Sequence, residues 1–277
     1  MKKIREIMGS SAVVSLVRAG ATVFLAVVLL ALGFCACLLP CTTDFFAKQT
    51  VATNVSPFSH DSLVKGANAT RDYTFFSHDK QKLLATIYIM NQELQSEKST
   101  ETAGKTSRIS STPQVDVNAD AVSLSTVELE NSLTNANEKY TLNKSAIEHL
   151  DDVYNVVQVA YPVLAVIFLL CVAGVAHVVF YRGWRGASNI FIVAGIVVLA
   201  LFSFLGVWAL VDFYSMFNAL HSLLFSGGSW LFSIDSLLIC MLPQNFWICL
   251  GALWLSTSVI ASIISVLCGI ALKRKTS

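Results

Sequence analysis

Two histidines in this sequence stand among residues that could support proton transfer. His149 lies in the stretch 148-EHLDD-152, where three carboxylates surround it. His221 ends the stretch 217-FNALH-221, in a part of the chain that lacks lysine and arginine. An imidazole suits general acid–base catalysis because its pKa lies close to the pH at which most enzymes work. We therefore take His149 and His221 as candidate catalytic residues.

The carboxylate best placed to assist His149 is that of Asp152. Residues three positions apart share one face of a helix, so Asp152 is expected beside His149, whereas Asp151 points elsewhere. A carboxylate in this position can orient an imidazole ring. It can equally be a charge near the start of a helix with no role in chemistry. Both interpretations of Asp152 remain open from the sequence.

The elements that must hold these histidines are membrane helices. The chain has 277 residues, of which 55% are hydrophobic and 13% are charged, with a mean hydropathy of +0.63. A soluble domain carries about 25% charged residues. Four apolar runs are long enough to cross a bilayer, which takes roughly 20 residues. We therefore predict an all-α integral membrane protein whose four transmembrane helices span residues 20–40, 156–180, 190–212 and 246–272.

The first apolar run resembles a signal peptide because basic residues precede it. It is longer than the apolar region of a signal peptide, which has about 7–15 residues, and no cleavage site between small residues follows it. We expect an uncleaved helix. Among the seven cysteines, Cys35, Cys37 and Cys41 lack a fourth ligand at zinc spacing, so packing or lipid contact is expected for them.

Basic residues predict the orientation of the chain in the membrane. They concentrate before the first run, in the short segment 181–189, and after the last run; they are Lys2, Lys3, Arg5, Arg18, Arg182, Arg185, Lys273, Arg274 and Lys275. Short loops rich in lysine and arginine stay in the cytoplasm. Residues 1–19 and 273–277 are therefore expected in the cytoplasm, and residues 41–155 and 213–245 on the outer side of the membrane.

The first outer segment divides by composition. Residues 58–94 show apolar positions at helical spacing, whereas residues 95–140 are rich in serine, threonine, asparagine and glutamate. The second part has too little apolar surface to offset the entropy of ordering it. We predict a partly disordered helical domain, in which 95–140 is a largely disordered insertion with one short helix near 124–133.

Both histidines are expected at the same depth. Ser145 and Glu148 form a capping box, which predicts a helix that starts near Ala146, bends at Pro162 and continues as the second span. His149 then lies about 10 Å outside the membrane boundary at Val156. In the second outer segment, phenylalanines and His221 recur every four residues from Phe213 to Phe225, and tryptophans typical of the membrane interface follow. That segment should therefore lie at the outer surface of the membrane.

The motifs around both histidines resemble those of a known family. The stretch 149-HLDDV-153 resembles an HLxDV motif, and Phe217 with His221, then Trp230, Asp235 and 242-LPxxF-246, resemble the second outer loop of the same proteins. The family is a bacterial family of four-helix integral membrane proteins that includes the lipoprotein intramolecular transacylase. The resemblance covers residues 145–272 and extends more loosely over 41–94.

The resemblance implies an acyltransferase. The best understood member of the family moves an acyl chain from the diacylglyceryl group of a lipoprotein to the amine of the lipoprotein's N-terminal cysteine, which gives the lyso form. The partners implied are a diacylglyceryl lipoprotein and membrane lipid, and the site would contain His149 and His221 with no metal and no cofactor. Asp152, Trp230 and Asp235 would support the site. Arg71 and Tyr73 could bind an oxygen of the glyceryl group or a headgroup, or could be structural or surface groups.

Composition and charge also bear on other functions. A transporter normally has ionisable groups in the middle of its spans, and the four predicted spans have none there. A net charge of +1 without a basic patch among aromatic residues argues against binding of nucleic acid. A non-enzymatic membrane adaptor remains open. For the three other histidines no role in chemistry is expected. His60 and His78 should be solvated, and His177 should lie near the inner end of the second span.

Overall fold

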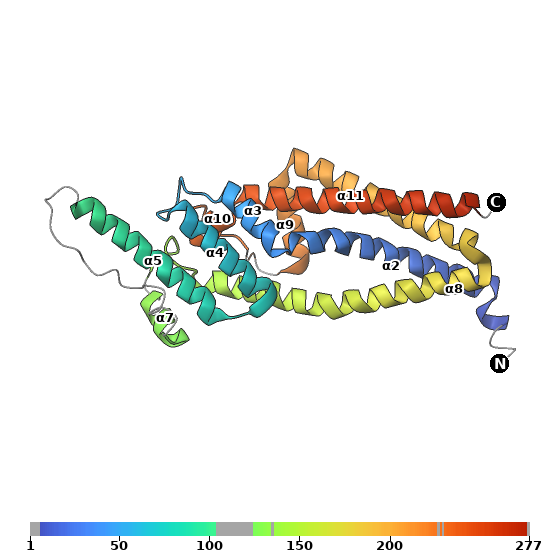
Figure 1. Cartoon of the computed structure of the whole chain (residues 1–277), viewed down its shortest axis with the longest axis horizontal. Helices are drawn as coiled ribbons and strands as arrows, with labels where there is room; N and C mark the ends of the chain where they lie inside the picture. The colour runs from blue at the N-terminus through green and yellow to red at the C-terminus, as the bar shows by residue number, and fades with distance from the viewer. Residues whose placement is uncertain (1–5, 104–123, 134–135, 226–227, 229, 276–277) are drawn as a thin grey trace. The chain divides into compact units, whose positions relative to one another are not determined.

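The computed structural model describes residues 6–103, 124–133, 136–225, 228 and 230–275. Every regular element in these described ranges is helical, as predicted (Figure 1). The elements are α2 (Ser11–Cys37), α3 (Pro40–Thr50), α4 (His60–Asp72), the π-helix η1 (Tyr73–Ser77), α5 (Lys80–Ala103), α7 (Thr126–Leu133), α8 (Lys144–Val211), α9 (Phe213–Leu224), α10 (Leu237–Met241) and α11 (Gln244–Lys275).

The number of candidate membrane spans differs from the prediction. Three helices in the described part of the chain, not four, are long and apolar enough to cross a bilayer: α2, α8 and α11. The difference arises because α8, with 68 residues, contains both of the middle predicted spans. Helical geometry persists through Pro162 and is interrupted at Gly183, where φ is 66° and ψ is 179°. A side chain strongly disfavours this conformation, so glycine suits the point where the two segments of α8 meet.

The chain forms two compact units. The first, which we call the bundle unit, comprises residues 1–38, 158–220 and 250–277. The second, which we call the head unit, comprises residues 39–157 and 221–249. The bundle unit therefore contains α2 with most of α8 and α11. The head unit contains α3, α4, η1, α5, α7 and α10, together with the start of α8.

Helices of the bundle unit pack through small residues. A Cβ atom added at Gly269 of α11 would lie 2.8 Å from the backbone oxygen of Ser188, and one added at Gly195 of α8 would lie 2.7 Å from that of Ser262. Such contacts let two helical backbones approach closely, which is how membrane helices associate when lipid is as apolar as their side chains. Large apolar side chains on the outside of the bundle, such as Leu169 and Leu210, are exposed. This surface is suited to contact with lipid.

The head unit has a core of its own. The apolar positions that predicted helices within residues 58–94 are buried; they include Leu63, Tyr73, Leu83, Leu84, Ile87 and Met90. The short helix α10 closes this core: its Met241 is buried, and the backbone N–H of Ala52 donates to the oxygen of Cys240 at 2.9 Å. The helical spacing in this part of the sequence is therefore confirmed.

The predicted insertion is more ordered than expected where it is described. Helix α5 continues to Ala103, and the predicted short helix is confirmed as α7, whose Leu129 and Leu133 are buried. Residues 136–140 are also anchored, since the ring of Tyr140 packs edge-on against Phe58 at 6.2 Å. A few apolar residues suffice to order these parts when a neighbouring helix covers them, and the largely disordered insertion over 95–140 stays a prediction. Residues 104–123 and 134–135 lie outside the described residues.

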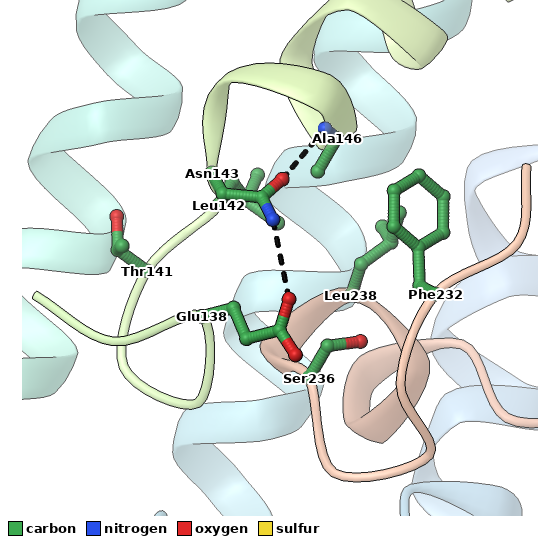
Figure 2. Close-up of a pocket in the computed structure, with 8 residues that line it drawn as sticks. All are labelled: Glu138, Thr141, Leu142, Asn143, Ala146, Phe232, Ser236 and Leu238. Atoms are coloured by element: carbon green, nitrogen blue, oxygen red, sulfur yellow. Dashed lines mark hydrogen bonds between the residues drawn. The ribbon is translucent and has the colours of Figure 1, made fainter. Parts of the chain in front are cut away.

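The start of α8 differs from the predicted capping box. The carboxamide oxygen of Asn143 accepts from the backbone N–H of Ala146 at 2.9 Å (Figure 2). The hydroxyl of Ser145 donates to the same oxygen. Asn143 is therefore the N-terminal cap, and α8 begins at Lys144. Glu138 accepts from the amide of Asn143 at 3.2 Å, which ties the cap to the preceding segment. Asparagine and serine are both good caps, so Asn143, two residues before Ser145, can take this role.

Glycine positions in α11 give a matched pair of substitutions. Gly269→Ala should lower the free energy of unfolding by about 1–3 kcal/mol, because the new Cβ would overlap the backbone of α8. Gly251→Ala, in the same helix, meets no atom within 4 Å and should be neutral or slightly stabilising. Thermal unfolding in detergent measures both. Equal midpoints for the two variants would contradict the close packing of α11 on α8.

Candidate functional site

The two candidate catalytic histidines lie beside each other in the head unit. His149 lies in the second turn of α8, and His221 lies near the end of α9. Their ring centroids are 6.4 Å apart, with an angle of 33° between the ring planes. The side chain of His149 is buried, with 8% of its surface exposed, whereas His221 is half-buried. Seventy-two positions of sequence thus separate two imidazoles that one small substrate group could contact together.

Aromatic rings surround this pair. Phe225 lies 5.1 Å from His149 and 5.8 Å from His221, measured between ring centroids. Phe232 lies 5.9 Å from His149, and Trp230 lies 5.9 Å from His221. We call these five residues the histidine cluster. Trp230 was expected here, and Phe225 belonged to the predicted repeat of four. Phe232 was not singled out, because a lone phenylalanine in an apolar loop gives no positional signal.

Burial determines the charge of His149. Desolvation lowers the pKa of His149 to about 4, and the neighbouring His221 lowers it further than Asp152 raises it. The imidazole of His149 is therefore neutral at pH 7. Its Nδ1 atom is buried and has no hydrogen-bond partner among the described residues. A buried polar atom without a partner costs about 1–3 kcal/mol, so Nδ1 of His149 would gain from a hydrogen bond with a group that enters the cluster.

Asp152 does not hold His149 by a hydrogen bond among the interactions described. It is exposed, and its negative charge raises the pKa of His149 less than burial lowers it. Its neighbour Asp151 is the carboxylate with close partners. Asp151 accepts a short hydrogen bond from the hydroxyl of Tyr73, and its Oδ1 lies 3.7 Å from Nε2 of His78.

The sequence predicts that His78 is solvated, but the structure shows that its ring is packed against other side chains. Its ring stacks on Tyr73 at 4.6 Å and on Tyr154 at 3.9 Å, between centroids. Its φ of 49° follows directly on the π-helix η1, a conformation uncommon for a residue with a side chain. Because Tyr73 is buried and donates a hydrogen bond to Asp151, its role is structural, in the interior of the head unit. This cluster fixes the turn of α8 that carries His149.

Two other expected supporting residues also make contacts within the protein. Arg71 donates to the backbone oxygen of Pro40 and to Oδ1 of Asn68, both at 2.8 Å, and pairs with Asp72. Asp235 pairs with Lys139 at 2.6 Å, and this cation lowers the pKa of Asp235. The contacts of Arg71 with Pro40 and of Asp235 with Lys139 join segments distant in sequence, whereas Asn68 and Asp72 are neighbours of Arg71 in the chain. Among the five supporting residues proposed from the sequence, Trp230 is the one in ring contact with the histidine cluster.

His60 and His177 complete the inventory of histidines. His60 is exposed on α4, where its ring lies 2.9 Å from the backbone oxygen of Lys48 and beside Asp61. The expectation of a solvated His60 agrees with this exposure. In the bundle unit, the ring of His177 packs against Tyr181 at 4.8 Å between centroids.

The burial of His149 predicts a pH dependence of stability. Because the pKa of His149 is lowered in the folded protein, the unfolded chain binds more protons between about pH 4 and 6.5. Stability should therefore fall as the pH falls through this range, by about 1.4 kcal/mol per pH unit for this group. His149→Gln removes this loss, so its thermal unfolding midpoint should improve relative to the unsubstituted protein between pH 6.5 and 4.5.

His60→Gln is a control of opposite sign. The hydrogen bond to the backbone oxygen of Lys48 and, to a smaller extent, the one to Asp61 raise the pKa of His60. The contribution of His60 to stability is therefore present at low pH and is lost as the pH rises. The thermal unfolding midpoint of His60→Gln should therefore fall relative to that of the unsubstituted protein as the pH falls. A constant difference between His149→Gln and the unsubstituted protein at all pH values would contradict the buried, neutral state of His149.

The cluster around Asp151 gives a second matched pair. Tyr73→Phe removes the donor to Asp151 and leaves a half-buried carboxylate without it, which should cost about 1–3 kcal/mol. Tyr154→Phe keeps the ring that stacks on His78 and should change stability by less than about 0.5 kcal/mol. Chemical or thermal unfolding in detergent measures the difference. A Tyr73→Phe variant as stable as Tyr154→Phe would show that the Asp151 contact contributes nothing.

Comparison with solved structures gives the fold of the whole chain. The chain is similar to the "in meso structure of the membrane integral lipoprotein intramolecular transacylase Lit from Bacillus cereus", with a TM-score of 0.51 and 16% sequence identity. The match covers 100% of this chain and 99% of that chain. No individual curated protein sequence matches significantly. At this identity, the structural likeness shows a shared fold.

Comparison with family models identifies the sequence. The model described as "Lipoprotein intramolecular transacylase Lit" matches residues 19–247, which is more than half of the chain and includes His149 and His221. The suspected resemblance is therefore confirmed by sequence and is in agreement with the fold. This chain belongs to the lipoprotein intramolecular transacylase family.

Proposed function

We propose that this protein is a membrane acyltransferase that converts diacylglyceryl lipoproteins to the lyso form. It moves an acyl chain from the diacylglyceryl group to the amine of the N-terminal cysteine. The observation that supports this most is the histidine cluster, in which two imidazoles with centroids 6.4 Å apart lie among three aromatic rings. Membership in the family indicates that acyl transfer is the reaction in which such a pair of imidazoles would act.

The reaction is an exchange of one acyl bond for another. The amine nitrogen attacks the ester carbonyl and forms a tetrahedral oxyanion. When the oxyanion collapses, the ester C–O bond breaks, the amide C–N bond remains, and the glyceryl oxygen leaves as an alkoxide. One proton must leave the nitrogen and one must reach that oxygen, so no proton is gained or lost overall. A pair of imidazoles can carry out both transfers.

We assign His149 as the base. Its imidazole is neutral at pH 7, and its unpartnered Nδ1 is available to a group that enters the cluster. With a pKa of about 4, it is too weak to deprotonate a free ammonium group, whose pKa is about 8. It can accept a proton from the nitrogen after attack, because bonding to carbon makes that nitrogen far more acidic. His221 then protonates the leaving oxygen or stabilises the oxyanion.

A nucleophilic side chain is unnecessary for this reaction. The amine and the ester belong to the same lipidated cysteine, and holding the two together can contribute about 7–11 kcal/mol to catalysis. Phe225 and Phe232 exclude water around His149 and provide an apolar surface for an acyl chain. We assign Trp230 to the wall beside His221 and Asp152 to a weak electrostatic influence on His149. Arg71, Tyr73 and Asp235 are assigned to the scaffold.

We also propose an orientation in the membrane. The two segments of α8 on either side of Gly183 each cross once, so that together with α2 and α11 the chain makes four crossings. The distribution of basic residues supports cytoplasmic termini and a cytoplasmic segment 181–189. Residues 41–155 and 213–245 would then face outward, where lipoproteins present their lipidated cysteine. The histidine cluster belongs to these outer segments.

The histidines are tested in a bacterial host that makes only diacyl lipoproteins. Expression of the unsubstituted protein should yield lipoproteins that carry one acyl chain on nitrogen and one on the glyceryl group, measured by mass spectrometry of the N-terminal peptide. His149→Gln and His221→Gln should each lower the yield per folded protein by a factor of about 10²–10⁴. The double variant should be little worse than the worse single variant, because both residues serve one reaction.

Two variants serve as controls for these substitutions. Asp152→Asn should have a smaller effect, because it alters only the charge near His149. His60→Gln should have full activity, since His60 is exposed and lies outside the histidine cluster; His78 is unsuitable because it supports the turn that carries His149. Full yield from either cluster variant would overturn the catalytic pair. No product from the unsubstituted protein, with a diacyl substrate present, would favour a non-enzymatic adaptor.

A further inference from the structure

A cavity in the bundle unit is lined by three arginines. Its volume is about 450 Å³, and it lies between the start of α2 and the part of α8 around Gly183. The polar residues that line it are Ser11, Ser15, Arg18, Arg182, Arg185 and Asn189. This volume falls within the range of about 300–1,000 Å³ that is typical of sites for small ligands. The cavity belongs to the bundle unit alone and shares no residue with the histidine cluster.

Local backbone geometry explains why the arginines converge. Ser11, Ser15 and Arg18 are four and three residues apart, which places them on one face of α2. In α8, the interruption at Gly183 lets Arg182 and Arg185, on either side of it, line the same cavity. A Cβ atom at Gly186 would lie 2.4 Å from Cβ of Arg182, so this glycine leaves the space that Arg182 occupies.

The cavity carries an uncompensated positive charge. None of its lining residues is acidic, and in the described part of the chain no ion pair or hydrogen bond engages the three guanidinium groups. The acidic residues among the described positions of the bundle unit are Glu6 and Asp212, and neither lines the cavity. The N-terminus of α2 adds the positive end of a helix dipole. The site is therefore suited to an anion.

The lining also contains an apolar part. Val14 and Val178 line the cavity and are themselves buried, with 5% and 0% of their surface exposed, in the core between α2 and α8. Three guanidinium groups match the oxygens of a phosphate, to which arginine can donate two parallel hydrogen bonds. Serine and asparagine add neutral hydrogen-bond donors. An apolar base beneath a phosphate-binding rim suits an amphipathic molecule better than a free ion.

We propose that this cavity binds the phosphate of an anionic phospholipid at the end of the bundle unit. Basic cavities between membrane helices are known to hold such headgroups. The proposal does not depend on the acyltransferase reaction, because the ligand is held by residues outside the histidine cluster. The simplest alternative is that the arginines only set the orientation of the chain, in which case any cation at this end of the unit would attract lipid equally.

Binding is tested on the full-length protein in an uncharged detergent. Short-chain phosphatidylglycerol, phosphatidylcholine with the same chains, and inorganic phosphate are titrated separately, and bound ligand is counted by native mass spectrometry with affinities from calorimetry. We expect one tight site for phosphatidylglycerol, weaker binding of phosphatidylcholine because its choline cancels the charge, and weaker binding of inorganic phosphate because it lacks the acyl chains.

Matched variants locate the site. The double variant Arg182→Gln/Arg185→Gln should weaken phosphatidylglycerol binding by at least about tenfold, and Arg18→Gln, from the opposite helix, should also weaken it. Arg182→Lys should have an intermediate effect, because lysine keeps the charge but loses the paired hydrogen bonds. Arg274→Gln is the control: it removes one cation from the exposed end of α11, which does not line the cavity.

Three outcomes would overturn the proposal. The first is unchanged phosphatidylglycerol binding in both the double variant and Arg18→Gln. The second is a loss in Arg274→Gln as large as that in Arg18→Gln, which would indicate attraction by net charge. The third is inorganic phosphate binding as tightly as the lipid, which would assign the site to a free anion. The three cavity arginines are exposed, and unfolding midpoints without lipid verify that the variants are folded.

Discussion

The chain must satisfy its backbone hydrogen bonds inside helices wherever lipid surrounds it, and most of its structure follows from this constraint. Because charged groups within lipid are energetically costly, polar and ionisable residues concentrate near the ends of membrane helices. Helix α8 illustrates the result: His149 lies near its first turn, Arg182 lies beside the interruption at Gly183, and the residues between them are largely apolar. Helix α8 thus contributes residues to both the histidine cluster and the arginine-lined cavity, before and after an apolar stretch of its sequence.

The surroundings of His149 show how one short motif can serve several purposes. The imidazole of His149 is buried against Phe225, and its pKa is lowered. Asp152 is exposed, and Asp151 accepts a hydrogen bond from Tyr73 within the head unit. Asp151 leaves the helix on the side roughly opposite His149, because successive residues are about 100° apart around its axis, whereas Asp152 lies about 60° from His149. The motif therefore supplies a candidate base, a solvent-facing charge and an anchor for the turn that carries the base.

Several features of the fold could be predicted from sequence because local physics decides them. Apolar length identified the membrane character, and helical spacing identified the buried positions Leu63, Ile87 and Met90. Other features failed where neighbouring residues compete or distant ones assist. Asn143 replaced Ser145 as the cap of α8, and α5 continues to Ala103, beyond the helical spacing read from the sequence up to residue 94. Gly183 lies in the segment 181–189 that was expected between two spans, but the sequence did not indicate that helix would continue up to this glycine from both sides.

The sequence by itself determined that this is a helical membrane protein, and its motifs led to the transacylase family. It also determined that His149 and His221 deserved attention, since their motifs are local. Tertiary structure alone decided that the two rings lie 6.4 Å apart, that Phe232 joins them, and that Arg71 donates to the backbone oxygen of Pro40. These are contacts between segments far apart in the chain. Helical spacing gives the face on which a residue lies, but only the packing of helices decides what that face meets.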